Sequence, residues 1–111
     1  MKITYTNSNS KITAEMEGET QIDLFEQISS FQEIFDETCC GKCESEDLRF
    51  VSRNVDDNLY YEIRCKDCGS RLSFGKTKQG GRLFPKRKDK EGGWLPNRGW
   101  VKWNPETKQE E

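Results

Sequence analysis

Two Cys-x-x-Cys pairs constrain the fold of this chain more than any other feature. The first pair is Cys40 and Cys43, the second is Cys65 and Cys68, and 21 residues lie between the pairs. Two such pairs at this separation are typical of a site in which four thiolates surround one zinc ion tetrahedrally. Because four thiolates close the coordination shell, the predicted Zn²⁺ is structural and stabilises the fold.

Other uses of the cysteines are disfavoured by their surroundings. Two disulfide bonds would need an oxidising compartment, and Met1 leads into polar sequence without the apolar segment of a signal peptide. A redox-active pair would be single and placed in a βαβ context, which the pattern lacks. Cys39 could replace Cys40, but Cys40 gives two matched Cys-x-x-Cys-x-Ser turns, and Gly41 beside it would allow a tight turn. We therefore expect Cys39 to be a half-buried spectator at the end of a preceding helix.

Composition and charge indicate one domain with a thin core and two electrostatic halves. Only 32% of the 111 residues are hydrophobic and 34% are charged, so zinc binding is expected to supply much of the stability. Residues 1–48 carry three basic and eleven acidic side chains, whereas residues 49–104 carry fourteen basic and six acidic ones. Residues 105–111, with one basic and three acidic side chains, read as a flexible acidic tail. No apolar run is long enough to span a bilayer, and free thiolates predict a reducing, cytoplasmic location.

The N-terminal sequence predicts a β-hairpin followed by an amphipathic helix. Residues 2–6 and 11–17 are rich in β-branched side chains, and polar turn residues join them. Thr20 fits a helix N-cap, with Asp23 three residues later. We expect the helix over about 21–37, packed on the hairpin and on the cysteine-rich segment. Its apolar stripe consists of Leu24, Ile28, Phe31 and Phe35, widened by Ile22, Phe25 and Ile34.

The residues between and after the cysteine pairs predict a three-stranded antiparallel sheet. Residues 48–54 and 59–65 form two strands joined by a tight turn in 55–58, and residues 71–74 form a third strand. Basic side chains are expected to project from this sheet together with Tyr60 or Tyr61: Arg49, Arg53, Arg64 and Arg71.

The cysteine turns resemble those of the zinc-ribbon superfamily. The resemblance rests on Cys40-Gly-Lys-Cys43 and Cys65-Lys-Asp-Cys68-Gly69 and covers residues 40–74. It implies a zinc-bound ribbon but no particular function, since ribbons bind DNA, RNA or protein. Glu44 departs from the glycine that is common after the second cysteine of such a turn, or knuckle.

The whole chain also resembles small uncharacterised zinc-ribbon proteins of bacteriophages and prophages. The resemblance rests on the stretches 60–65, 72–75, 83–87 and 99–103. It implies a role in phage-type DNA metabolism or in the takeover of a bacterial host, and a place in the cytoplasm of that host.

Together these features predict an α+β domain over residues 1–104. Its parts are a hairpin plus helix (1–38), packed on a four-cysteine zinc ribbon (39–75), and a basic, tryptophan-rich segment (76–104). The flexible tail of residues 105–111 follows.

Basic side chains interleaved with aromatic rings over 49–103 predict binding of single-stranded nucleic acid. Lysine and arginine neutralise phosphates, and exposed rings stack on unpaired bases. The predicted contacts are Arg71, Lys76, Lys78, Arg82, Phe84, Lys86, Arg87, Lys88, Trp94 and Trp100, with Tyr60 as a further candidate ring. The competing interpretation places tryptophans in the core, because a chain with few apolar residues needs them there. On that ground, at least two of Trp94, Trp100 and Trp103 are expected to fold back against the ribbon.

The leading functional prediction is a non-enzymatic nucleic-acid-binding accessory protein of weak sequence specificity. The alternative is a zinc-stapled inhibitor or adaptor that binds a protein of the host machinery, with the acidic N-terminal half facing a basic partner. An enzyme is not expected, because the chain has no histidine and shows no nucleophile–base pair. The sequence does not indicate an oligomeric state.

Overall fold

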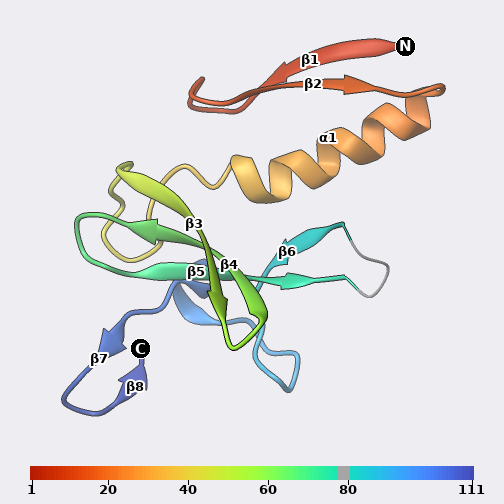
Figure 1. Ribbon diagram of the computed structural model, residues 1–111. Coiled ribbons are helices and arrows are strands. Elements are labelled where there is room, and N and C mark those ends of the chain that lie inside the picture. The colour runs from red at the N-terminus through yellow and green to blue at the C-terminus, as the bar shows by residue number, and fades with distance from the viewer. Residues whose placement is uncertain (78–80) are drawn as a thin grey trace. The chain divides into compact units, whose positions relative to one another are not determined.

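A computed structural model of the chain describes residues 1–77 and 81–111. The chain forms two compact units, Met1–Thr38 and Cys39–Glu111, whose helices and strands are labelled in Figure 1. The fold is α+β, as predicted, with an N-terminal hairpin, one α-helix in the described residues and small antiparallel sheets. The units divide where the sequence separates helix from ribbon. That both units make one domain stays a prediction.

The first unit begins with the predicted hairpin. Strands β1 (Lys2–Thr6) and β2 (Thr13–Glu17) pair antiparallel, with Tyr5 opposite Ala14. The buried Asn7 holds the connecting loop, because its Oδ1 accepts from the amides of Lys11 and Ile12 at 3.0 Å each. Its Nδ2 donates to the carbonyl of Phe35, 2.8 Å away, and so ties this loop to the end of the helix.

Helix α1 (Gln21–Phe35) follows, and its start matches the prediction. Thr20 and Asp23 form a reciprocal capping box, in which each side chain accepts a hydrogen bond from the backbone amide of the other residue. The predicted stripe faces the hairpin: Leu24 and Phe31 form a buried cluster with Met16. Packing of the helix on the ribbon stays a prediction.

Two residues predicted to widen the stripe lie outside it. Ile22 is 70% exposed and Phe25 is 75% exposed, because the two-stranded hairpin covers only one narrow side of the helix. Ile34 is half-buried, in keeping with the prediction.

The second unit is built on a four-stranded antiparallel sheet in the order β3-β4-β5-β6. Its strands are β3 (Leu48–Val55), β4 (Asn58–Cys65), β5 (Arg71–Lys76) and β6 (Leu83–Pro85). The turn between β3 and β4 is Asp56-Asp57, both with positive φ (52° and 66°), as the favoured two-residue hairpin turns require. The first three strands are those predicted, and β6 adds a fourth from the basic segment.

The C-terminal residues fold back onto this sheet. A short 3₁₀ turn, η1 (Pro96–Gly99), leads to Trp100, which is 1% exposed, and Val101 then bridges Arg71 of β5. Strands β7 (Trp103–Asn104) and β8 (Gln109–Glu110) form a small hairpin. The expected flexible tail is therefore paired. Two backbone hydrogen bonds between Lys102 and Glu111, both 2.8 Å, close it.

Candidate metal centre and basic pockets

The four predicted cysteines converge at one point of the second unit. Their sulfur atoms all lie within 4.8 Å of one another. The Cys40 and Cys68 sulfurs are 3.6 Å apart, and the Cys43 and Cys65 sulfurs are 3.5 Å apart. A zinc ion bonded tetrahedrally to four sulfurs at about 2.3 Å places them about 3.8 Å apart, whereas a disulfide bond is about 2 Å long. The cysteines therefore fit one structural metal ion, and the sulfur donor set suits zinc.

The two knuckles that carry these cysteines have the same backbone hydrogen bonds. The amide of Cys40 donates to the carbonyl of Ser45 (2.8 Å), and that of Cys65 donates to Ser70 (2.9 Å). Within each knuckle, the amide of the residue after the second cysteine donates to the carbonyl of the first cysteine. These bonds are Glu44 to Cys40 at 3.0 Å and Gly69 to Cys65 at 3.1 Å. The matched Cys-x-x-Cys-x-Ser sequences thus produce matched turns.

Hydrogen bonds to sulfur favour the thiolate form that a metal needs. The amides of Lys42 and Cys43 donate to the Cys40 sulfur (3.3 and 3.5 Å), and the Cys68 amide donates to Cys65 (3.5 Å). The buried Ser70 hydroxyl lies 3.0 Å from the Cys68 sulfur and can donate to it once that thiol is ionised. These donors compensate for the burial of negative sulfur.

The four thiols do not ionise alike without a cation. Burial raises the pKa of Cys40. The Ser45 amide favours the thiolate of Cys43, but the neighbouring sulfurs, Cys65 foremost, outweigh it and raise its pKa to about 12. Burial opposes ionisation of Cys68 too, yet the Ser70 hydroxyl and amide lower its pKa to about 6. Metal binding must therefore displace protons, so affinity falls as the pH falls.

Gly41 has a different role from the predicted one. Its φ is not positive, so the turn does not depend on glycine there. A Cβ at this position would lie 2.1 Å from the Asn97 carbonyl oxygen and 2.5 Å from the Trp100 ring. Gly41 thus lets the tryptophan and its loop approach the first knuckle closely. The positive φ values are instead at Glu44 (63°) and Gly69 (78°).

Replacing Glu44 by glycine is expected to stabilise the protein. A residue with a side chain in the left-handed region costs about 1–2 kcal/mol, and added freedom of the unfolded chain returns part of it. We expect the free energy of unfolding of Glu44→Gly to rise by about 0.5–1 kcal/mol, measured by urea titration at fixed zinc concentration. Gly69→Ala is the matched control and should lose stability, because its φ of 78° disfavours a side chain. The new Cβ would have no atom within 4 Å, so no clash contributes to the loss. Stability losses in both variants would contradict this account of Glu44.

A row of three arginines crosses the sheet beside the second knuckle. Arg49 of β3 is directly opposite Arg64 of β4, which is directly opposite Arg71 of β5. Like charges at directly opposed positions destabilise a sheet. With Lys66 and Trp103 they line a pocket of about 430 Å³, here called the arginine pocket, completed by Cys65, Gly69 and Val101. No carboxylate is among these lining residues.

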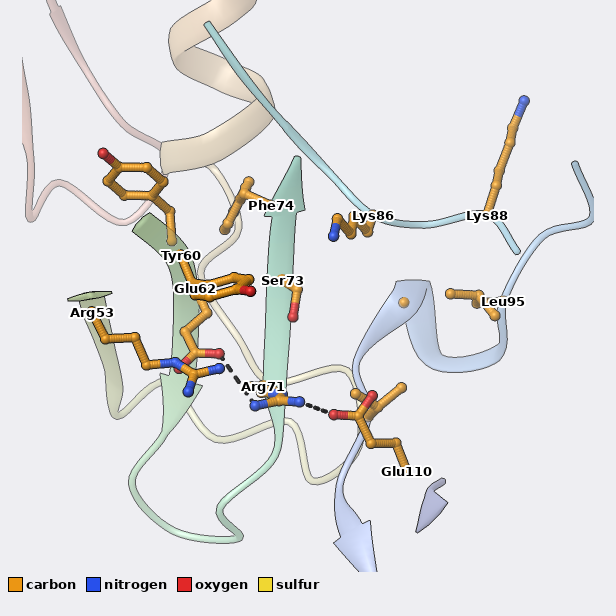
Figure 2. Close-up of a pocket in the computed structure, with 13 residues that line it drawn as sticks. Arg53, Tyr60, Glu62, Arg71, Ser73, Phe74, Lys86, Lys88, Leu95 and Glu110 are labelled. Carbon is orange, nitrogen blue, oxygen red and sulfur yellow. Dashed lines mark ion pairs between the residues drawn. The ribbon is translucent and has the colours of Figure 1, made fainter. Parts of the chain in front are cut away.

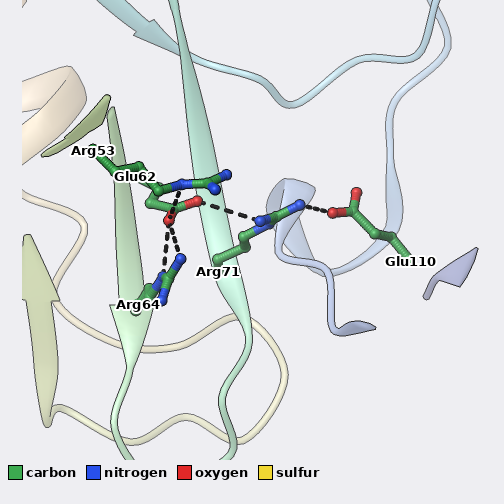
Figure 3. A network of polar contacts seen from close by, with 5 residues as sticks. All are labelled: Arg53, Glu62, Arg64, Arg71 and Glu110. Atoms are coloured by element: carbon green, nitrogen blue, oxygen red, sulfur yellow. Dashed lines mark hydrogen bonds and ion pairs between the residues drawn. The ribbon is translucent and has the colours of Figure 1, made fainter. Parts of the chain in front are cut away.

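The buried Glu62 pairs with two members of this row, Arg64 and Arg71, and with Arg53. Its side chain is 2% exposed, and its Oε1 accepts from the Arg64 Nε at 2.8 Å. The Arg53 Nε is 3.1 Å from the same oxygen, and the Arg71 Nη1 is 3.6 Å from Oε2. Figure 3 shows the carboxylate at the centre of the three guanidinium groups. The pairing compensates for burial of this charge and leaves the cluster cationic.

A second pocket adjoins the first across Arg71. It has a volume of about 330 Å³ and is called the tyrosine pocket. Figure 2 shows its charged lining around the strand that carries Arg71. Four cationic and two acidic side chains line it, together with aromatic rings: Arg53, Arg71, Lys86 and Lys88; Glu62 and Glu110; Tyr60, Tyr61 and Phe74. Both pockets also share Val101.

The structure brings together three of the predicted contact residues and places the others elsewhere. Arg71, Lys86 and Lys88 line the tyrosine pocket. Lys88 lies over the Trp94 ring, 4.5 Å from its centroid, and that ring is 73% exposed. Lys76, Arg82 and Phe84 are exposed but line neither pocket. Lys78 lies outside the described residues.

One predicted contact, Trp100, is wrong, and a second, Arg87, has a structural contact while its role as a binding residue stays a prediction. Trp100 is 1% exposed and cannot stack on a base, because it is packed against Gly41 of the first knuckle. The half-buried Arg87 donates from Nη1 to the Arg98 carbonyl at 2.6 Å and so holds the loop that carries η1. The expectation of two core tryptophans is also wrong, since Trp94 and Trp103 are 73% and 56% exposed.

The predicted contact set omitted residues of the arginine pocket. Arg49 and Arg64 were expected to project from the sheet, and their alternation with apolar residues along the strands was the available signal. Lys66 and Trp103 had no such signal, because a knuckle and a two-residue strand place them.

Cys39 is half-buried as predicted but follows the end of α1, and its carbonyl accepts from Arg98 Nη2 at 3.0 Å.

Comparison with known proteins adds no relative. No family model matches the chain, and no curated protein or solved structure is significantly similar to it. The resemblances to zinc-ribbon and phage proteins therefore stay predictions, as does the cytoplasmic location. Across residues 1–77 and 81–111, the helices are too short or too polar to cross a membrane.

Proposed function

We propose that this protein is a non-enzymatic accessory factor that binds single-stranded nucleic acid through the arginine pocket. The observation that carries the proposal is the row Arg49–Arg64–Arg71, in which three like charges are directly opposed across the sheet. Such a row costs stability, and a bound polyanion would offset that cost. Guanidinium groups suit phosphates because they donate in a planar fork.

The exposed rings favour single strands over a duplex. Trp103 lines the arginine pocket and is 56% exposed, and the exposed Trp94 adjoins the tyrosine pocket through Lys88. Unpaired bases stack on such rings at about 1–3 kcal/mol per base, with little dependence on sequence. Stacking on rings at two pockets would therefore give weak sequence specificity.

Fluorescence anisotropy of labelled oligonucleotides tests the proposal. Single-stranded and duplex DNA and RNA are titrated at low and at physiological salt. Binding that favours single strands and weakens with salt is expected. No binding of any oligonucleotide at low salt would remove the proposed function.

A double substitution tests the arginine pocket itself. Arg49→Gln with Lys66→Gln removes two of its four cations and leaves the three arginines around Glu62 in place. We expect affinity for a single strand to fall about tenfold at physiological salt and the salt slope to flatten by about 1.4, since each phosphate contact contributes about 0.7. Lys11→Gln with Lys90→Gln is the matched control, because it removes the same charge from exposed residues that line neither pocket. Equal losses in both double variants would mean that only net charge matters.

A protein-binding inhibitor or adaptor is the second candidate. It is favoured by Ile22 and Phe25, two exposed apolar side chains three residues apart on α1, since neighbouring exposed apolar residues mark protein contacts. This surface belongs to Met1–Thr38, whereas both pockets belong to Cys39–Glu111. The two candidates therefore depend on different units of the chain.

A further inference from the structure

Arg71 lines both pockets and pairs with both carboxylates that line the tyrosine pocket. Its Nη1 faces Glu62, and its Nη2 forms an ion pair with Glu110. Figure 2 shows the guanidinium between these two carboxylates. A strand that occupies both pockets would therefore have a phosphate near Arg71.

The two carboxylates differ in how firmly they are held. Glu62 is 2% exposed and pairs with three arginines, so withdrawing it would break three ion pairs at once and leave Arg53 and Arg64, which are only partly exposed, without their carboxylate. Glu110 is 38% exposed and pairs with Arg71 alone among the ion pairs of the described residues. A pair exposed to this degree is weak and screened by salt. Glu110 can therefore leave Arg71 at little cost, whereas Glu62 cannot.

The C-terminal hairpin delivers Glu110 to this position. Glu110 of β8 is paired with Trp103 of β7, which lines the arginine pocket. The start of the hairpin is fixed to the sheet by reciprocal hydrogen bonds between Val101 and Arg71, of 2.8 and 2.9 Å. One short hairpin thus supplies an exposed ring to the proposed site and a carboxylate to its central cation.

We propose that the Glu110 carboxylate competes with a phosphate of the bound strand for Arg71. In the free protein this carboxylate occupies Arg71, and in the complex a phosphate replaces it, so that one strand runs through both pockets over Arg71. This inference rests on the proposed nucleic-acid binding. A single phosphate gains one contact and must displace one, whereas a strand gains contacts from the other cations at the same time. The competitor therefore selects polyanions against small phosphates.

The test compares Glu110→Gln with Glu106→Gln by anisotropy with a labelled oligothymidylate at physiological salt. Both variants remove one negative charge from the same hairpin, but Glu106 lines neither pocket. Glu110→Gln is expected to bind about fourfold more tightly than the wild-type protein, the worth of one phosphate contact at this salt. Glu106→Gln should tighten binding less than twofold. Inorganic phosphate should compete better against the oligonucleotide on Glu110→Gln than on the wild-type protein.

The outcomes separate this inference from the proposed function. Equal tightening in the two variants, or none in either, overturns the competitor role while wild-type binding keeps the proposed function. Absence of binding by the wild-type protein and by both variants, at low salt as well as at physiological salt, overturns the proposed function and the inference with it. Binding at physiological salt by Glu110→Gln alone, with wild-type binding recovered at low salt, supports both, because the competitor then masks the site in the wild-type protein.

Discussion

Replacing Cys65 by serine is expected to abolish zinc binding and unfold residues 39–111. Structural zinc sites contribute about 10–16 kcal/mol to folding in zinc-finger peptides, which is as large as the whole net stability of a typical domain. Cys65 is 3% exposed, and its backbone closes the second knuckle through bonds to Ser70 and Gly69. Zinc content and the dispersion of amide signals in an NMR spectrum measure the effect.

Cys39→Ser is the matched control for this substitution. Cys39 adjoins the first knuckle, but its sulfur is not part of the four-cysteine cluster, and the contact it offers Arg98 is made mainly through its carbonyl oxygen. This variant should keep one zinc ion and a dispersed spectrum. A folded, zinc-loaded Cys65→Ser protein would instead show that the ligand assignment is wrong.

Trp100→Ala is expected to impair stability, whereas Trp94→Ala is expected to impair binding of a single strand and not stability. Truncating the buried Trp100 should lower the free energy of unfolding by about 3–5 kcal/mol, because its ring packs against Gly41 in the first knuckle. Trp94 is 73% exposed, so its truncation should change stability by less than about 0.5 kcal/mol. The same change should weaken binding of a single strand by about 1–3 kcal/mol through the lost stacking.

Urea titration at saturating zinc and oligonucleotide anisotropy separate these effects. A stable Trp100→Ala protein would show that the ring does not support the knuckle. Unaltered strand affinity in Trp94→Ala would remove this ring from the proposed binding surface and would restrict stacking to Trp103.

The metal centre and the main strands could be predicted from the sequence because local spacing determines them. Two Cys-x-x-Cys pairs fix four ligands whatever surrounds them, and alternating side chains locate β3 and β4. The capping box at Thr20 and Asp23 likewise needs only neighbours in the chain. Such features are encoded within a few residues of one another.

Which tryptophans are buried could not be predicted, because contacts with residues distant in the sequence determine it. Trp100, Val101, Lys102 and Trp103 show no clean alternation, and burial of Trp100 depends on Gly41, which is 59 residues earlier in the sequence. The acidic tail looked unstructured because nothing local marks a two-residue strand. Backbone bonds between Lys102 and Glu111 close this hairpin, and backbone bonds between Val101 and Arg71 join it to a strand about thirty residues earlier in the sequence.

The opposed arginines would also link binding of the proposed ligand to the stability of the second unit. In the free protein, Arg49, Arg64 and Arg71 repel one another across the sheet, and Glu62 offsets that repulsion only in part. An anion bound among them removes the remaining repulsion, so part of its binding energy is the relief of a cost already present in the fold. By the same linkage, removing one of these arginines would stabilise the free sheet and lower its affinity for the proposed ligand. The surface proposed to bind the strand would thus also be a part of the sheet that becomes more stable when it is occupied.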